Sequence, residues 1–142
     1  MQTTLRSGIA ETEERPAITV VLVDDHVGVL DGLERLFGLY PDIVVCARCV
    51  TIEHGLQTVL ACPPDVVLLD LHFPGHGGLD FLRMLQQTPT STRVIVLTAG
   101  ADEDDLGAAI HLGAAGIVFK DAAPWDLPSA IRHVHAGQTW LT

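Results

Sequence analysis

Cationic side chains are scarce in this sequence of 142 residues. It carries 8 lysines and arginines against 18 aspartates and glutamates, which gives a formal net charge of −10. Because proteins bind nucleic acids largely through lysine and arginine contacts to phosphates, we expect this domain by itself not to bind DNA or RNA. A carboxylate-rich chain suits a hard cation such as Mg²⁺ instead.

Long apolar runs are missing as well. The N-terminal stretch MQTTLRSGIAETEERPA lacks the apolar core of a secretion signal, and no run approaches the roughly 20 apolar residues that cross a bilayer. The three cysteines are an odd number, which does not indicate a disulfide framework. We therefore expect a cytoplasmic protein with reduced thiols and no contact with a membrane.

The residues that are present fit one domain with a substantial core, because 48% of them are apolar. Residues 1–17 are polar and are expected to form a flexible N-terminal extension, which leaves 18–142 for the domain. Unbroken β-branched runs, typical of strands covered on both faces, begin near Ile18, Ile43, Val66, Val94 and Ile117. Stretches of helical periodicity follow each run, at 30–40, 56–60, 79–85, 106–110 and 127–134. This alternation predicts an α/β fold with a doubly wound (βα)₅ parallel sheet.

Polar side chains stand where the predicted strands end. Asp24 and Asp25 follow the first strand, Asp70 the third, Thr98 the fourth and Lys120 the fifth. The carboxyl ends of parallel strands share one edge of a sheet, where ligands bind at the reversal of strand order. If the order is 2-1-3-4-5, as in other doubly wound proteins, the three aspartates converge.

Each of these residue types has a chemical role at such an edge. Three carboxylates repel one another unless a proton or a cation lies among them, and Mg²⁺ accepts a few carboxylates together with water and phosphate oxygens. A carboxylate such as Asp70 can attack phosphorus. Lys120 can supply a positive charge to phosphoryl oxygens and Thr98 a hydroxyl donor, while the small Ala99 leaves the site open.

The chain carries four motifs, VLVDDH at 21–26, LLDLHFPGHGGLD at 68–80, LTAG at 97–100 and VFKDA at 118–122. Together they resemble the receiver domain of two-component response regulators. Asp70, Pro74 and Gly78 have the family's spacing around its phospho-acceptor, and the resemblance runs from about residue 18 to about 141. The C-terminal segment LGAAGIVFKDAAPWDLPSAIRHVHAGQTWL further resembles receivers of the NarL/FixJ (LuxR-type) subfamily.

The resemblance implies a flavodoxin-like sheet of order 2-1-3-4-5 and a signalling role. A sensor histidine kinase would phosphorylate Asp70, with Mg²⁺ held by Asp25, Asp70 and the backbone carbonyl of His72, and by Asp24 through water. Thr98 and Lys120 would hold the phosphoryl oxygens.

The output implied by the resemblance is a switch in conformation or homodimerisation, not enzymatic turnover beyond the domain's own phosphorylation and dephosphorylation. The switch would control a C-terminal DNA-binding domain that is not part of this sequence, and thereby transcription. The alternative is a stand-alone receiver that acts in a phosphorelay or binds a protein partner.

The sequence departs from the family at position 117. Receivers usually carry Tyr or Phe three residues before the conserved lysine, as a rotating switch, and Ile117 stands there instead. We therefore expect phosphorylation to act through movement of Thr98, with Ile117 only repacking. A second departure is Gly77, where a polar residue is common.

Several other patterns have competing interpretations. A phosphatase of the haloacid-dehalogenase type needs D-x-D after the first strand, whereas this chain has Asp-Asp-His. Cys46 and Cys49 form a C-x-x-C, but on a strand, so buried or edge thiols are favoured over redox or metal chemistry. His72 and His76 are interpreted as polar loop residues, with a zinc site that includes Asp70 as the lesser alternative. Packing is the favoured role of Cys62, Trp125 and Trp140, with an interface role as the alternative for the two tryptophans.

Overall fold

The computed structural model describes residues 16–100 and 103–141, so most of the predicted extension at 1–17 lies outside the described residues. The described part alternates strands and helices as the sequence predicts. No helix in these two ranges is long and apolar enough to cross a membrane. The elements are β1 (Ile18–Val23), α2 (Val27–Phe37), β2 (Ile43–Cys49), α3 (Ile52–Ala61), β3 (Val66–Asp70), the 3₁₀ turn η1 (Pro74–His76), α4 (Gly77–Gln86), β4 (Arg93–Thr98), α5 (Glu103–His111), β5 (Gly116–Phe119), α6 (Asp126–His135) and β6 (Trp140–Leu141).

The strands form one parallel sheet in the order β2-β1-β3-β4-β5-β6, which confirms the expected 2-1-3-4-5 arrangement. The structure adds a sixth strand, β6, which pairs Trp140 with Gly116 and Leu141 with Ile117 along β5. The prediction of five strands was wrong in this respect, because a strand of two residues leaves no run of apolar residues to detect.

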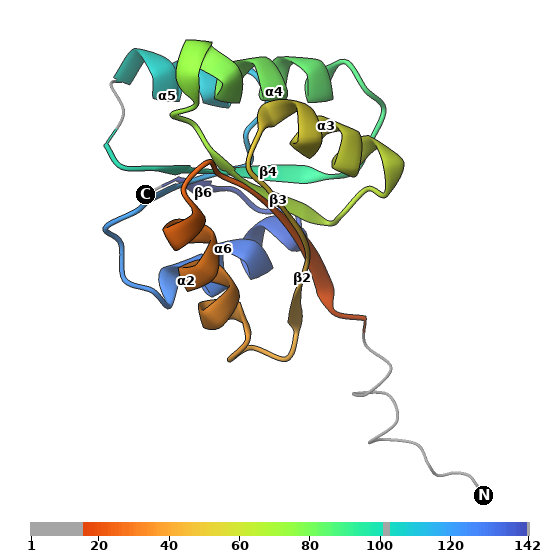
Figure 1. Ribbon diagram of the computed structural model, residues 1–142, viewed down its shortest axis with the longest axis vertical. Helices are drawn as coiled ribbons and strands as arrows, with labels where there is room; N and C mark the ends of the chain where they lie inside the picture. The colour runs from red at the N-terminus through yellow and green to blue at the C-terminus, as the bar shows by residue number, and fades with distance from the viewer. Residues whose placement is uncertain (1–15, 101–102, 142) are drawn as a thin grey trace, which may run out of the picture.

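Helices cover both faces of the sheet (Figure 1). On one face α2 and α6 pack against the strands, and on the other α3, α4 and α5 do so. Side chains of one strand alternate between the two layers, as Val20 and Leu22 face α2 and α6 while Val21 and Val23 face the other helices. All five residues of β3 are buried, as expected for a central strand covered on both sides.

Four predicted packing residues are exposed. Leu60 in α3 and Ile110 in α5 leave 53% and 45% of their surface exposed, although both fall on the helical periodicity. Trp125 is 66% exposed and Cys62 is exposed, so their assignment to the core was wrong. Trp140 is partly buried, with its ring edge-on to His133 at 5.0 Å between centroids, as predicted for a packing residue.

The thiols fit the structural interpretation of the C-x-x-C. All three cysteines are free, with Cys49 buried and Cys46 exposed on the edge strand β2. The pairing of β1 with β2 skips Cys46, which makes it the extra residue of a β-bulge. Its Sγ contacts the carbonyl oxygen of Val20 at 3.4 Å, and desolvation raises the pKa of the Cys46 thiol.

An ion pair between Arg132 and Asp42 holds α6 at the end of the sheet opposite to Asp24, Asp25 and Asp70. The Arg132 guanidinium donates two hydrogen bonds to Asp42, from Nε at 2.8 Å and from Nη2 at 3.0 Å. These bonds lower the pKa of the Asp42 carboxyl and raise the pKa of Arg132. The same guanidinium lies 5.3 Å from the centre of the Tyr40 ring, so α6 is tied to the turn before β2.

Candidate functional site

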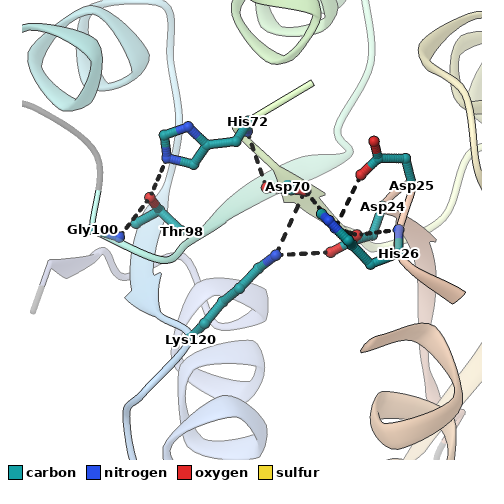
Figure 2. Close-up of polar contacts among 8 residues, drawn as sticks. All are labelled: Asp24, Asp25, His26, Asp70, His72, Thr98, Gly100 and Lys120. Carbon is teal, nitrogen blue, oxygen red and sulfur yellow. Dashed lines mark hydrogen bonds and ion pairs between the residues drawn. The ribbon is translucent and has the colours of Figure 1, made fainter. Parts of the chain in front are cut away.

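The polar residues predicted at the strand ends meet at the carboxyl edge of the sheet (Figure 2). Asp24 and Asp25 follow β1, and Asp70 is the last residue of the neighbouring β3. The chain reverses its direction of winding between these two strands, because β2 lies on one side of β1 and β3 on the other. Such a reversal opens a crevice at the strand ends, and that crevice is where this fold binds ligands.

Two similar turns orient the side chains of the buried residues Asp24 and Asp70. Asp24 Oδ1 accepts a hydrogen bond from the backbone N–H of His26 at 2.8 Å, and Asp70 Oδ1 accepts one from the N–H of His72 at 3.0 Å. These side chains are 2% and 1% exposed. Their Oδ2 atoms are buried without a hydrogen-bond partner. Since a buried carboxylate oxygen needs a donor or a cation, both Oδ2 atoms fit a site for a positively charged ligand.

One cation of the protein reaches these oxygens. Lys120, directly after β5 and the only lysine of the sequence, places Nζ 3.3 Å from Asp24 Oδ2 and 3.6 Å from Asp70 Oδ2. Its backbone N–H donates to the carbonyl oxygen of Thr98 at 2.6 Å, which ties the end of β5 to β4. With all three aspartates ionised, one ammonium leaves two negative charges, which a divalent cation would balance.

His26 belongs to the same cluster, although the sequence analysis did not select it. Its Nδ1 lies 3.1 Å from Asp24 Oδ1, 3.1 Å from Asp25 Oδ1 and 3.8 Å from Asp70 Oδ2. One donor atom from each of these four residues lies within 4.8 Å of the others, a spacing that can hold a metal ion. The only hint in the sequence was that His26 follows the aspartate pair directly.

Thr98 and His72 form the other side of the site. Thr98 is fully buried as the last residue of β4, and its Oγ1 lies 3.1 Å from His72 Nε2 and 3.3 Å from the backbone N of Gly100, which donates to it. The His72 ring therefore turns to the threonine and is not part of the four-residue cation cluster. This placement removes the geometric basis for a zinc site made from Asp70 and the His72 ring.

The two remaining predicted residues are not in the cluster. Ala99 is exposed next to Thr98, as a small residue at an open rim would be. Ile117 is 5% exposed and packs in the layer with α3, α4 and α5. It borders an apolar cavity of about 170 Å³, whose other lining residues are Leu106, Ile110, Phe119 and Leu141.

Two glycines at the start of α4 pack closely on the loop after Asp70 and on α3. A Cβ on Gly78, in the first turn of α4, would lie 2.7 Å from the carbonyl oxygen of Leu71. A Cβ on Gly77 would lie 2.9 Å from a side-chain carbon of Ile52. Glycine at these positions lets α4 pack directly on the segment that carries Asp70, and a side chain at position 77 would crowd Ile52 and Phe73.

Comparisons with known proteins identify the family of this chain. A sequence model of the response regulator receiver domain matches residues 20–132. The chain is 34% identical over 131 residues to the nitrate/nitrite response regulator protein NarL of Escherichia coli K12, covering 92% of this chain and 60% of NarL. It is 35% identical over 124 residues to response regulator UvrY of Escherichia coli O157:H7, covering 87% of this chain and 57% of UvrY. It thus spans about three fifths of the length of these relatives.

Solved structures share the fold. The isolated receiver domain of RcsB from Salmonella enterica serovar Typhimurium, with the phosphomimetic BeF₃⁻, matches with a TM-score of 0.80 at 26% identity, over 89% of this chain and 94% of that chain. A LuxR-family response regulator from Aurantimonas sp. SI85-9A1 matches with a TM-score of 0.82 at 30% identity, over 87% of this chain and 89% of that chain.

Proposed function

Because the chain belongs to the response regulator receiver family, with relatives of the NarL/LuxR type, we propose that it is a phosphorylation-driven switch with Asp70 as the phospho-acceptor. The observation that carries the proposal is the Asp70 carboxylate itself. It is 1% exposed, its Oδ2 has no hydrogen-bond donor, and that oxygen lies beside the Lys120 ammonium and the Asp24–Asp25 pair. A buried, oriented and only partly neutralised carboxylate is a nucleophile at the edge where this fold binds ligands.

Asp70, Lys120 and Thr98 have different roles in the proposed phosphoryl transfer. Asp70 Oδ2 forms the new P–O bond, while the bond from phosphorus to the donor breaks and the donor atom keeps the electron pair. With a phosphohistidine donor, that atom is an imidazole nitrogen. Lys120 is placed to neutralise phosphoryl oxygens, and Thr98 to donate a hydrogen bond to one of them after it leaves His72.

We propose Mg²⁺ as the metal of this site, where Asp25, Asp70 and the backbone carbonyl of His72 would hold it and Asp24 would contribute through water. The fit rests on the unbonded Oδ2 atom of Asp24 and on the clustered carboxylates, which supply the oxygen ligands that Mg²⁺ prefers. When bound, Mg²⁺ would neutralise charge on the transferred phosphoryl group.

The proposed partners follow from the family. A sensor histidine kinase would supply the phosphoryl group in the cytoplasm, and phosphorylation would shift the conformation or favour a homodimer. RcsB, a structural relative, has been solved as dimers bound to DNA. For this chain, with its net charge of −10, we propose that any DNA contact is made by a separate domain and that the receiver itself does not turn over a substrate as an enzyme.

The test is phosphorylation in vitro with a matched control. The protein is incubated with Mg²⁺ and acetyl phosphate, and its intact mass is measured. Wild type and Asp80→Asn, a change at an exposed aspartate of α4 that pairs with Arg83, should gain one phosphoryl group, whereas Asp70→Asn should gain none. Equal labelling of Asp70→Asn and wild type would contradict the assignment.

A further inference from the structure

His26 is placed in a way that the start of a helix does not explain. It is the N-cap residue of α2, and its backbone carbonyl accepts hydrogen bonds from Val29 and Leu30, but its side chain makes no capping hydrogen bond. The ring turns instead to the aspartate cluster (Figure 2), although 62% of the side chain is exposed and could face solvent. The backbone N–H of His26 is held by Asp24 Oδ1, so the ring starts from a fixed position.

The separations of Nδ1 from the Asp24 and Asp25 oxygens fit a shared ion, and the Asp70 oxygen lies somewhat farther away. Two donors that each lie about 2.1 Å from one metal are about 3.0 Å apart at right angles and about 3.4 Å apart at the tetrahedral angle. The observed separations from His26 Nδ1 are 3.1 Å to Asp24, 3.1 Å to Asp25 and 3.8 Å to Asp70. Asp70 Oδ2, the most distant of these oxygens, is also one of the two buried oxygens without a hydrogen bond.

The chemistry of the donors selects the ion. Mg²⁺ takes oxygen ligands, whereas imidazole nitrogen suits Zn²⁺, Fe²⁺, Ni²⁺ and Cu²⁺. We propose that His26 is a metal ligand, and that the set Asp24, Asp25, His26 and Asp70 binds a first-row transition cation, with Zn²⁺ as the type, more tightly than it binds Mg²⁺. The coordinate bond uses the Nδ1 lone pair of a neutral ring whose proton is on Nε2.

This site has a consequence that rests on the proposed function. A cation held by all four residues engages Asp70 Oδ2, the oxygen that would attack phosphorus. Such a cation therefore opposes phosphorylation, whereas Mg²⁺ supports it. His26 would make the acceptor sensitive to the kind of metal available, and not only to the phosphodonor.

The experiment measures binding separately from phosphorylation. The whole chain is stripped of metal with a chelator, and Zn²⁺ and Mg²⁺ are titrated in separate calorimetric experiments. The variants are His26→Ala, His26→Gln, whose amide still donates to carboxylates, and the control His54→Ala at an exposed position of α3. Co²⁺ replaces Zn²⁺ in a parallel absorption titration, because thiolate charge-transfer bands would reveal binding to the exposed Cys46 or Cys62.

We expect both His26 variants to lose at least about 10-fold in Zn²⁺ affinity, because losing a ligand should cost no less than losing a residue that orients one. Their Mg²⁺ affinity should change by less than about threefold, since Mg²⁺ does not depend on imidazole. His54→Ala should match wild type. Zn²⁺ should also block labelling by acetyl phosphate in wild type but not in His26→Ala.

Three results would overturn the proposal: unchanged Zn²⁺ affinity in His26→Ala, recovery of wild-type affinity in His26→Gln, or an equal loss of Mg²⁺ and Zn²⁺ binding. The last two would mean that His26 only orients the carboxylates. These results leave the proposed function intact as long as Mg²⁺ binds and Asp70 is labelled. Failure of wild type both to bind Mg²⁺ and to accept phosphate would instead contradict the proposed function.

Discussion

Replacing Gly78 with alanine adds one methyl group at the point where α4 lies closest to the acceptor loop. A Cβ at this position would stand 2.7 Å from the carbonyl oxygen of Leu71, 2.9 Å from its Cα and 3.0 Å from its carbonyl carbon. All three neighbours are backbone atoms, so no side-chain rotation relieves the contact. Leu71 is also fastened to β4 through a 3.3 Å hydrogen bond from its N–H to the carbonyl oxygen of Leu97.

The size of the effect follows from two opposing contributions. Forcing an extra methyl group into a packed site costs about 1–3 kcal/mol. Alanine gains up to about 1 kcal/mol over glycine inside a helix, and less in the first turn, where Gly78 lies. We therefore expect Gly78→Ala to lower the free energy of unfolding by about 1–2 kcal/mol. Leu71 follows Asp70 directly, so labelling by acetyl phosphate should also slow.

Urea unfolding measures the stability change, and Gly32→Ala is the matched control. Gly32 is exposed in the middle of α2, and a Cβ there would meet no atom within 4 Å. The same chemical change should therefore stabilise the fold by up to about 1 kcal/mol, with labelling unaffected. If Gly78→Ala is as stable as wild type and is labelled at the same rate, the close packing of α4 on Leu71 is not a constraint.

Three further predictions concern other parts of the molecule. Mg²⁺ should raise the melting temperature of wild type, because it binds the native state. The substitution Asp25→Ala should reduce or abolish that rise, and an equal rise in both proteins would count against the metal site. With BeF₃⁻ as phosphoryl mimic, hydrogen exchange and sedimentation should reveal a conformational or dimerisation change in wild type and in Ile117→Tyr but not in Thr98→Ala. A normal change in Thr98→Ala would mean that the switch does not act through Thr98. Arg132 lowers the pKa of the Asp42 carboxyl from 3.8, so the pair stabilises the fold above that pH, and this contribution is lost as the pH falls through the lower pKa of the folded state. Asp42→Asn should therefore reduce the loss of unfolding free energy at low pH, as measured with urea, by less than about 1 kcal/mol, because the pair is exposed. An unchanged pH profile would show that the pair contributes nothing.

The strands and their order were the most predictable part of the fold. Unbroken β-branched runs mark strands buried on both faces, and β3, with all five residues buried, shows this pattern most clearly. β6 was missed because two residues, Trp140 and Leu141, have no periodicity. Its pairing with β5 depends on where α6 ends, which is a tertiary effect.

Burial on the helices was less predictable than the helices themselves. Leu60 and Ile110 follow the helical period, yet both are exposed, because the sheet covers only a narrow stripe of α3 and α5. Trp125 and Cys62 were assigned to packing by residue type alone. Both stand at helix ends, beside the N-terminus of α6 and the C-terminus of α3, where the core does not reach.

The candidate site also has residues that the sequence predicts and residues that it does not. Asp24, Asp70, Thr98 and Lys120 were predictable because each stands at a strand end and the topology brings strand ends together. The roles of the two histidines were not predictable, because they depend on side-chain direction. His26 and His72 each follow an aspartate turn, but one ring lies among the carboxylates and the other lies against Thr98.

Lys120 has one more consequence, which follows from the composition of the chain. As the only lysine, it carries the only ε-amino group, and 21% of its side chain is accessible. Apart from the α-amino group, an amine-selective acylating reagent would therefore find a single amine, at the site itself. Acylation would remove the ammonium of Lys120 that faces Asp24 and Asp70, so one covalent event at one side chain would change the charge of the pocket. The degree of labelling of that amine would in turn report how much of the pocket is occupied.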